Sequence, residues 1–348
     1  MTATDLHQAL LVHTDAERAE LAIECADRES GGLVLDGRQG LVAARYVMEH
    51  KGFTRPILLD ASAYTGKNRK IANDPFDANW ISQQRRLRLP VVLPDAGYVA
   101  QGNEAGLLTV LSRVHDDRPD MVAPLALHKS WLNAKEGLPT LRQHVSDAGV
   151  PIALILEDTG DPFKARYALQ GLVEILQLGV KVYVLRCDVA AVGALAFGAE
   201  TAAVGTRTAL RHFYPQVENN GGGGVAQVAA LVRGTLSYVS LDKIDKEVQK
   251  DPDNQLWWCD CVVCGGQNLS WIKGAPDPRV AAYLHSVEAL YQIRADLFEN
   301  NATPAQRRRA WIAQCDSAIF QHEDIVSGWE PQKVLGNWSS LRDIEPIT

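Results

Sequence analysis

The sequence predicts an α/β fold, a (β/α)8 TIM barrel followed by a small cysteine-containing subdomain near the C-terminus. Short apolar or β-branched runs alternate with helix-like segments through the first two-thirds of the chain. This alternation is typical of parallel strands that are buried on both faces. Seven or eight such units follow one another, which favours a closed barrel. Three cysteines then fall within the stretch "WWCDCVVCGG" at 257–266.

The alternative architecture is an open, doubly wound parallel sheet. Sheets of that kind that bind dinucleotides carry a G-x-G-x-x-G motif after the first strand. No such motif follows "GLVLDG" at 32–37, the first predicted strand. The missing motif weakens a dinucleotide-binding interpretation, and we predict the barrel.

The predicted elements follow from apolar runs that are bounded by Gly, Pro and Asp, with helical periodicity between them. Strands are expected at 32–37, 56–62, 89–97, 120–130, 150–160, 180–188 and 200–206, with an eighth at 234–242. The predicted organisation is a helical segment at 1–30, the barrel at 31–245, the cysteine-containing subdomain at 246–300, and a helical segment at 301–348 that completes the barrel. "NNGGGG" at 219–224 lacks P-loop spacing and predicts either a mobile loop at the barrel mouth or a linker.

Composition excludes some classes of protein. The 348 residues carry a formal net charge of −7, which does not suggest non-specific nucleic-acid binding. Two local basic clusters stand out, "QQRRLRL" at 83–89 and "AQRRRAW" at 305–311, and either one alone is more typical of a solvated surface. No apolar run approaches the roughly 20 residues that span a bilayer. The N-terminus resembles no secretory signal, so we expect a cytoplasmic protein.

Polar residues end most of the predicted strands. In a barrel of this kind the chemistry lies at the carboxyl ends of the strands. About half of these acids are expected to be helix N-caps. The remaining carboxylates suit a ligand rich in hydrogen-bond donors, such as the adjacent N–H and NH2 groups of a guanine-like base. The strand-end residues are Asp36, Asp60, Asp95, His128, Glu157, Asp158, Asp188 and Arg207.

The cysteine cluster has the spacing C-x-C-x-x-C, formed by Cys259, Cys261 and Cys264. Three thiolates and one imidazole suit tetrahedral zinc. His285 lies on the predicted helix 278–298 and is the first choice for the fourth ligand, with His322 as the second. Because four protein ligands leave no open position, we predict a structural Zn2+ in a zinc-binding subdomain. The alternative is three reduced, metal-free cysteines, which is less favoured because close-spaced thiols are reactive.

The zinc motif "CDCVVC" with "AAYLHSVEALYQI" resembles the tRNA-guanine transglycosylases, which include the queuine and archaeosine enzymes and DNA-acting relatives that insert 7-deazaguanines. "PILLDASAYTG" at 56–66 is similar to a family strand that ends in a catalytic Asp, here Asp60. "VKVYVLRCDVAAVGALAFGAETAAVGTRTALRH" at 180–212 is similar to the family's penultimate unit. The similarity covers most of residues 30–300. The chain departs from the family at Ala203, where the resemblance places a nucleophilic Asp, and at Ala61-Ser62-Ala63, where the family has Ser-Gly-Gly.

The resemblance implies a pentosyltransferase that exchanges guanine for a 7-deazaguanine in tRNA or DNA. A carboxylate attacks C1′, guanine leaves, and the deazaguanine restores the glycosidic bond, which requires two carboxylates. The expected catalytic pair is Asp60 and Asp188, although Asp188 is also a good helix N-cap. The implied partners are nucleic acid and the base, with a homodimer or a heteromeric subunit as further options. Base recognition is expected from Asp95, Glu157 or Asp158, and backbone contacts from Arg85, Arg86 and Arg88 or from the arginines at 307–309.

Two other functions remain open at the level of sequence. A non-catalytic, transglycosylase-like subunit that binds nucleic acid or a partner is favoured by Ala203. An unrelated barrel enzyme, such as a lyase or aldolase, would need a Schiff-base lysine at a strand end, and Lys129 is the candidate near such a position.

Overall fold

The computed structural model describes residues 6–115, 120–216 and 227–342. The chain divides into two compact units after Gln216, and each unit is described by itself. Within these ranges every helix is too short or too polar to span a lipid bilayer. The glycine run at 219–224, for which we predicted a loop, lies outside the described residues.

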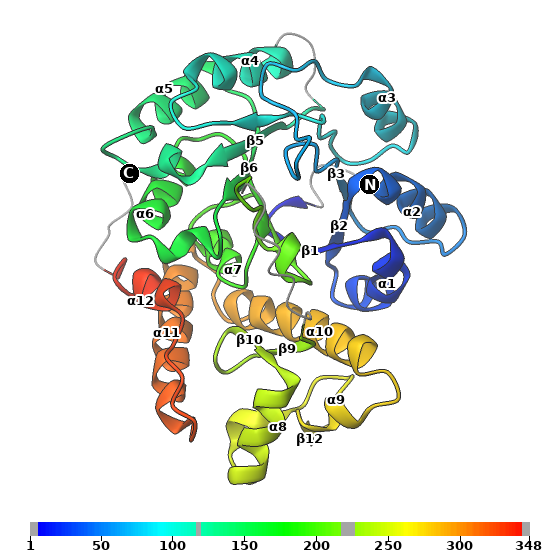
Figure 1. Ribbon diagram of the computed structural model, residues 1–348, viewed down its shortest axis with the longest axis vertical. Coiled ribbons are helices and arrows are strands. Elements are labelled where there is room, and N and C mark those ends of the chain that lie inside the picture. Colours follow the sequence, from blue (N-terminus) through cyan, green and yellow to red (C-terminus); the bar gives the residue numbers. More distant parts are fainter. Residues whose placement is uncertain (1–5, 116–119, 217–226, 343–348) are drawn as a thin grey trace. The chain divides into compact units, whose positions relative to one another are not determined.

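The first unit is built on an eight-stranded sheet in the order β3-β2-β1-β8-β7-β6-β5-β4. Every neighbouring pair is parallel. The sheet is curled and surrounded by helices (Figure 1). Its strands are β1 (Ala9–Thr14), β2 (Gly32–Asp36), β3 (Ile57–Asp60), β4 (Tyr98–Val99), β5 (Ala123–His128), β6 (Ile152–Glu157), β7 (Val182–Cys187) and β8 (Thr201–Gly205).

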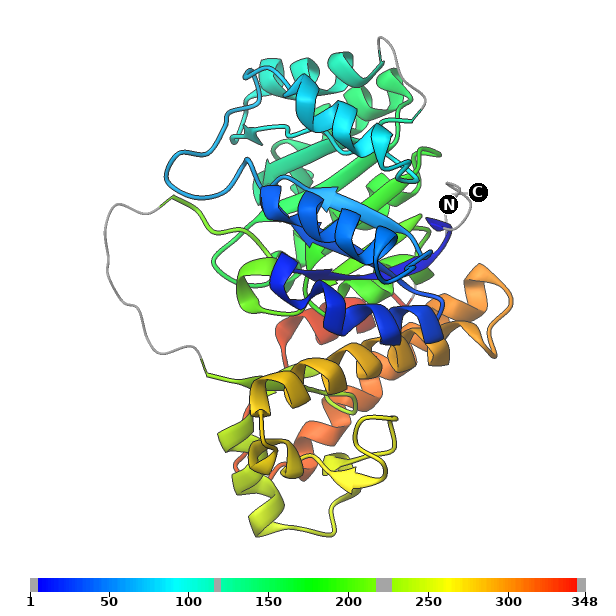
Figure 2. The ribbon, with the colours of Figure 1, turned by 90° about the vertical axis from the view of Figure 1, so that its right-hand side faces the viewer.

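Helices follow most of these strands and return the chain to the amino ends of the strands. α1 and α2 pack side by side (Figure 2). The helix α5 (Leu138–Ala148) ends before Gly149, which adopts the left-handed conformation with φ 62°. The helices are α1 (Ala19–Arg28), α2 (Gly37–Glu49), α3 (Ala78–Arg86), α4 (Glu104–His115), α5 (Leu138–Ala148), α6 (Arg166–Leu176) and α7 (Ala191–Ala196).

The alternating strand–helix pattern is confirmed, but the prediction of a purely helical segment at 1–30 was wrong. The sheet begins with β1, "ALLVHT", in which all six residues are buried. A short apolar run cannot be distinguished from a buried helix by periodicity alone. The eighth strand of the sheet is therefore β1, which lies between β2 and β8.

Two other predicted strands differ from the structure. Residues 89–97 contribute only an isolated bridge between Val92 and Met121 before the short strand β4. Pro90 and Pro94 flank that bridge, and proline cannot donate to a strand ladder. Residues 234–242 contain β10 (Ser237–Ser240), which pairs antiparallel with β9 (Ala229–Val232) in the second unit. Its side chains alternate between buried and half-exposed, which is typical of an antiparallel strand with one covered face.

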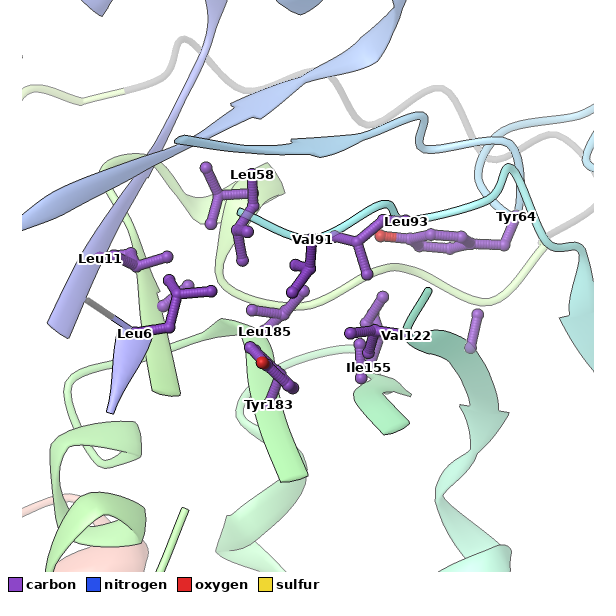
Figure 3. Packing of buried hydrophobic residues seen from close by; sticks show 14 of the residues in the cluster. Leu6, Leu11, Leu58, Tyr64, Val91, Leu93, Val122, Ile155, Tyr183 and Leu185 are labelled. Carbon is purple, nitrogen blue, oxygen red and sulfur yellow. The ribbon is translucent and has the colours of Figure 1, made fainter. Parts of the chain in front are cut away.

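Apolar side chains from several strands meet inside the curled sheet. Leu11 of β1, Leu58 of β3, Ile155 of β6 and Leu185 of β7 belong to one buried cluster (Figure 3). Ala203 of β8 lies in the same cluster and is fully buried. The interior of the sheet is therefore filled by side chains, and polar chemistry is confined to the strand ends.

The second unit contains the β9–β10 hairpin, the cysteine loop and the C-terminal helices. Asp277 caps α10 by accepting from the backbone N–H groups of Arg279 and Val280, and Thr303 and Gln306 form a capping box at α11. The other elements are α8 (Leu241–Lys250), β11 (Trp258–Cys259), β12 (Gln267–Asn268), α9 (Trp271–Gly274), α10 (Pro278–Phe298), α11 (Pro304–Gln321) and α12 (Lys333–Ser339).

The division after Gln216 falls earlier than the predicted barrel boundary at 245. The described residues between 227 and 245 belong to the second unit, as do α11 and α12. The expectation that the helical segment 301–348 completes the barrel stays a prediction. All eight strands of the sheet already come from residues 9–205.

Candidate functional site

Three polar side chains meet where β1, β2 and β3 end. Asp36 and Asp60 are register partners at the carboxyl ends of β2 and β3, and His13 lies near the end of the neighbouring β1. The Nε2 atom of His13 lies 3.8 Å from Oδ1 of Asp36 and 3.7 Å from Oδ2 of Asp60. One donor atom from each residue falls within 4.8 Å of the others. We call His13, Asp36 and Asp60 the rim cluster.

Asp60 is held by its own loop. Its Oδ1 accepts from the backbone N–H of Ser62 at 2.8 Å, and its Oδ2 accepts from the hydroxyl of Tyr64 at 2.5 Å. The hydroxyl of Ser62 donates to Oδ1 of Asp36. The loop that differs from the family's Ser-Gly-Gly thus fixes both carboxylates with a serine and a tyrosine.

Arg186 of β7 supplies the positive charge of this site. Its Nη1 lies 3.3 Å from Oδ2 of Asp60, and its Nη2 lies 3.4 Å from Oδ1 of Asp36. Nη1 also donates to the hydroxyl oxygens of Ser62 at 2.8 Å and Tyr64 at 3.0 Å. Only 5% of the Arg186 side chain is exposed, so the guanidinium compensates the two carboxylates away from bulk water.

The backbone is strained at this point. Arg186 has φ 55° and Ser62 has φ 52°, in the left-handed region that costs free energy for a residue with a Cβ. β7 also shifts its register against β8 between Val184 and Cys187. Such strain persists when surrounding contacts hold it, and it concentrates at functional sites. Here it aims the guanidinium at two carboxylates.

His13 is buried and neutral. Its side chain has no exposed surface, and neither ring nitrogen has a hydrogen-bond partner among the described residues. Burial lowers the pKa of His13 to about 4, against the opposing effect of Asp60. The sequence prediction missed His13 because it assigned residues 1–30 to helix. The run "ALLVHT" was the available signal.

A cavity of about 620 Å³ opens beside the rim cluster. It lies between α1 and α2 at the carboxyl ends of β1, β2 and β8, and Asp36 forms part of its wall. Asp15 and Arg207 line the polar side, and Tyr46 lines the apolar side. This volume falls in the range of about 300–1,000 Å³ that is typical of small-molecule sites.

The carboxylates predicted to bind a base have cationic partners within the protein. Asp95 accepts from Lys70 Nζ at 2.6 Å, and Glu157 accepts from Arg69 Nη1 at 2.5 Å. The space beside Asp60 and Asp95 is only about 10 Å³, which is too small for a base and holds at most one water. In this conformation both carboxylates are paired with cations, and the pocket that Asp95 lines is too small for a base.

Asp158 is also internally paired. Lys129 and Lys164 lie 2.6 and 2.8 Å from its two oxygens. Although burial opposes ionisation, hydrogen bonds from these lysines lower the pKa of Asp158 to about 2. The same hydrogen bond raises the pKa of Lys129. A Schiff-base lysine needs a lowered pKa, so this pairing does not favour the lyase or aldolase alternative.

Asp188 lies apart from the rim cluster. Its Oδ1 accepts from the backbone N–H of Val189 at 2.8 Å, and its Oδ2 lies 3.8 Å from Nη1 of Arg211. α7 has Ala190 as its N-cap and no side-chain cap hydrogen bond, so Asp188 does not cap this helix in the way that was its alternative. The carboxylate that the structure brings to Asp60 is Asp36.

The predicted arginine cluster lies at the opposite end of the strands. Arg85 forms a two-point ion pair with Asp120, at 2.8 and 3.0 Å, and Asp120 precedes β5. Arg85 and Arg86 end α3, the helix that returns from the rim, and Arg88 follows it. Because a helix after a strand runs back to the strand's amino end, Arg85, Arg86 and Arg88 lie away from the rim cluster, and the structure does not favour them as contacts to a nucleic-acid backbone bound there.

The cysteine cluster of the second unit has the geometry of a metal site. Nδ1 of His285 lies 3.7 Å from Sγ of Cys259, 3.6 Å from Sγ of Cys261 and 3.2 Å from Sγ of Cys264. A tetrahedral ion with bonds of about 2.3 Å to sulfur and about 2.05 Å to nitrogen places these atoms about 3.6 Å apart. The residues present therefore fit a metal ion, as the sequence predicted.

Neighbouring contacts hold His285 and the cysteine loop in an orientation that suits a metal ion. Nε2 of His285 lies 2.7 Å from the carbonyl oxygen of Leu231. When Nε2 donates there, Nδ1 carries the lone pair that a metal needs. Gly265 and Gly266 adopt φ 59° and 81°, which allows the chain to turn back after Cys264. His322 contacts the carbonyl oxygen of Ala318 at 2.6 Å and is not part of this four-residue group.

Comparison of the chain with protein-family models and with curated proteins finds no match. The resemblance to transglycosylases therefore rests on the residues quoted above.

Proposed function

We propose that the protein is a nucleobase transglycosylase that exchanges guanine for a 7-deazaguanine in tRNA or DNA, on a curled sheet of the (β/α)8 type. The observation that carries the proposal is the pair of carboxylates at the ends of β2 and β3. One carboxylate oxygen of Asp36 and one of Asp60 lie within 4.8 Å of one another. The carboxyl groups of retaining glycosidases, which form a covalent sugar–enzyme intermediate, lie about 5 Å apart.

Asp36 is the proposed nucleophile because 19% of its side chain is exposed and it lines the cavity. Its carboxylate would attack C1′, and the bond from C1′ to the base nitrogen would break as guanine takes up a proton. The deazaguanine nitrogen would then attack C1′, lose its proton and release Asp36. Asp60 is 4% exposed and is the proposed proton-holding partner, poised by Tyr64.

The base is proposed to bind in the 620 Å³ cavity. Asp15 would accept from the N–H and NH2 groups on the edge of guanine, and the apolar wall with Tyr46 would contact its ring. The target nucleotide must be unpaired or flipped out to reach this cavity. This assignment replaces Asp95, Glu157 and Asp158, whose charges are neutralised inside the protein.

The ion of the cysteine site is proposed to be zinc with a structural role. Cys259, Cys261, Cys264 and His285 supply four ligands, which suits tetrahedral zinc and leaves no position for substrate. When bound, the ion would hold the loop at 259–266 to α10. No step of the proposed reaction depends on it.

Base exchange is the direct test. The purified protein should incorporate a labelled 7-deazaguanine or guanine into either tRNA or DNA. Asp36→Asn and Asp60→Asn should each lower the rate by at least about 100-fold, as loss of a nucleophile or proton-transfer group does. Asp188→Asn is the matched control, and its rate should stay within a few-fold of wild type. Exchange that survives Asp36→Asn would exclude this mechanism.

A non-catalytic binding subunit is the second candidate, and Ala203 favours it. This residue stands where the family resemblance places a nucleophile, and it is fully buried among apolar side chains. If wild type shows no exchange with tRNA or DNA but still binds one of them, the subunit assignment replaces the enzyme. Guanine, and not adenine, should raise the melting temperature if the cavity binds the base in either case.

A further inference from the structure

We propose that the rim cluster of His13, Asp36 and Asp60 is a binding site for a divalent first-row transition-metal cation. The three residues end three adjacent parallel strands, so the sheet itself fixes their spacing. Their donor atoms lie within 4.8 Å of one another. This inference does not depend on the transglycosylase proposal.

The unpartnered imidazole is the second observation that points to a ligand. His13 has no exposed side-chain surface, and among the described residues neither of its nitrogens is hydrogen-bonded. Burying a polar group without a partner is unfavourable, and such groups are rare in folded proteins. Nε2 of His13 nevertheless points between the oxygens of Asp36 and Asp60. A cation between the three atoms would satisfy that nitrogen.

The distances suit such an ion. A tetrahedral cation bonded at about 2.1–2.2 Å separates its ligand atoms by about 3.5 Å. The observed separations from His13 Nε2 are 3.7 Å to Asp60 and 3.8 Å to Asp36. Both separations exceed the tetrahedral value by only about 0.3 Å, so small side-chain movements would let His13, Asp36 and Asp60 bind one ion.

The charge and donor type limit the kind of ion. Two carboxylates and one guanidinium, Arg186, leave one negative charge at the cluster. One imidazole with two carboxylates suits Mn2+, Fe2+ or Zn2+, whereas Mg2+ and Ca2+ prefer sites made of oxygen alone. Because Arg186 competes for the same oxygens, we expect micromolar and not nanomolar affinity. Asp36 also lines the 620 Å³ cavity, which gives the ion a route from solvent.

Mn2+ is the probe for the rim cluster, because the thiolates of the cysteine site prefer softer ions than Mn2+. The cysteine site can also be filled with zinc before the titration. Full-length protein carrying one equivalent of Zn2+ should be titrated with Mn2+ and followed by electron paramagnetic resonance and calorimetry. We expect one Mn2+ per chain. His13→Gln and Asp36→Asn should each weaken binding at least 10-fold. Glu17→Gln, an exposed carboxylate on the same cavity wall, should leave it unchanged.

Several results would overturn the proposal. One is no Mn2+ binding to wild type; another is equal binding by wild type and by a folded Asp36→Asn protein. Asp36 is partly exposed, so this variant should fold even if His13→Gln does not, and melting curves check that. Weakening by Glu17→Gln as large as that by Asp36→Asn would mean that the cavity attracts cations without the rim cluster. The measurement is independent of base exchange, so its failure leaves the transglycosylase proposal standing. Because the ion and the proposed displacement use the same oxygens, bound Mn2+ should also slow any exchange.

Discussion

The loop after β6 offers a sharp test of how burial controls ionisation in this protein. Oδ1 of Asp161 accepts from the backbone N–H of Phe163 at 2.9 Å. Oδ2 is buried and has no hydrogen-bond partner among the described residues. Burial, together with the nearby charges of Asp188 and Asp158, raises the pKa of Asp161 to about 7.

The sign of the effect follows from proton binding. In the unfolded chain the pKa of Asp161 returns to 3.8. Between these values the folded state holds a proton that the unfolded state has released, so the free energy of unfolding falls as pH rises from about 4 to 7. The shift is about 3 pH units, and at 1.36 kcal/mol per unit it destabilises the fold by about 4 kcal/mol at pH 8. Asp161→Asn keeps the acceptor for Phe163 and removes the charge.

We therefore expect Asp161→Asn to be more stable than wild type at pH 8, by up to about 4 kcal/mol or roughly 10 °C in melting temperature. The difference should shrink to less than about 1 kcal/mol at pH 4, where Asp161 is protonated in the folded state and only about half ionised in the unfolded state. The assay is thermal or urea unfolding of both proteins from pH 4 to 8. A gain that does not vary with pH, or a loss of stability at pH 8, would refute this account of Asp161.

Asp77 is the control, because its carboxylate should change the free energy of unfolding in the opposite direction. It also caps a helix, through the backbone N–H groups of Asn79 and Trp80. A hydrogen bond from Arg38 lowers the pKa of Asp77, so its carboxylate stabilises the folded state above its unfolded pKa, and this contribution is lost as pH falls. Asp77→Asn should therefore destabilise the protein at neutral pH. Gains from both substitutions would indicate a general charge effect.

Three further predictions concern the metal site, a close backbone contact and the basic cluster. Purified protein should hold about one zinc per chain. Because metal binding and folding are coupled, Cys261→Ser should lower both the zinc content and the melting temperature. A metal-free protein with the same melting temperature as the zinc-loaded protein would contradict this. Gly97→Ala should lower the free energy of unfolding by at least about 2 kcal/mol in urea, because a Cβ at Gly97 would lie 2.2 Å from the carbonyl oxygen of Ile71. Gly274→Ala is the control and should change it little, because a Cβ at Gly274 meets nothing within 4 Å. Arg86→Ser should leave tRNA and DNA affinity unchanged in a filter-binding assay, since Arg86 lies at the amino ends of the strands; a marked loss would restore it as a contact.

The cysteine site could be predicted because its information is local. Cys259, Cys261 and Cys264 lie on one turn, and His285, the first choice for the fourth ligand, lies on the next long helix, so spacing and chemistry indicated the four residues that the structure brings together. The alternating strands and helices were equally accessible, since each is defined by a short apolar run. β1 was missed because nothing in "ALLVHT" distinguishes a buried strand from a buried helix until its neighbours are known.

The rim cluster depends on contacts between distant parts of the chain. Arg186 and Asp60 are 126 positions apart in sequence, and no spacing rule connects them. The strand-end aspartates also look alike in sequence, yet Asp95 has no exposed side-chain surface and Asp36 is 19% exposed. Three groups from other segments contact Asp95, namely the Lys70 and Arg38 side chains and the backbone N–H of Asp77. The sequence therefore predicted which edge of the sheet carries the carboxylates, but it could not show which of them line a cavity.

β8 shows why the family's nucleophile cannot simply be restored at Ala203. Ala203 is fully buried and pairs with Leu11 of β1. Gly205, two residues on and on the same face of the strand, would place a Cβ 2.3 Å from the backbone of Leu210. A carboxylate at either position would be buried without a partner or would displace the chain. We therefore expect Ala203→Asp to destabilise the protein by at least about 3 kcal/mol in urea unfolding and to create no base exchange. A well-folded Ala203→Asp protein with new or faster exchange would mean that β8, and not the carboxylate pair on β2 and β3, is where the sugar is attacked.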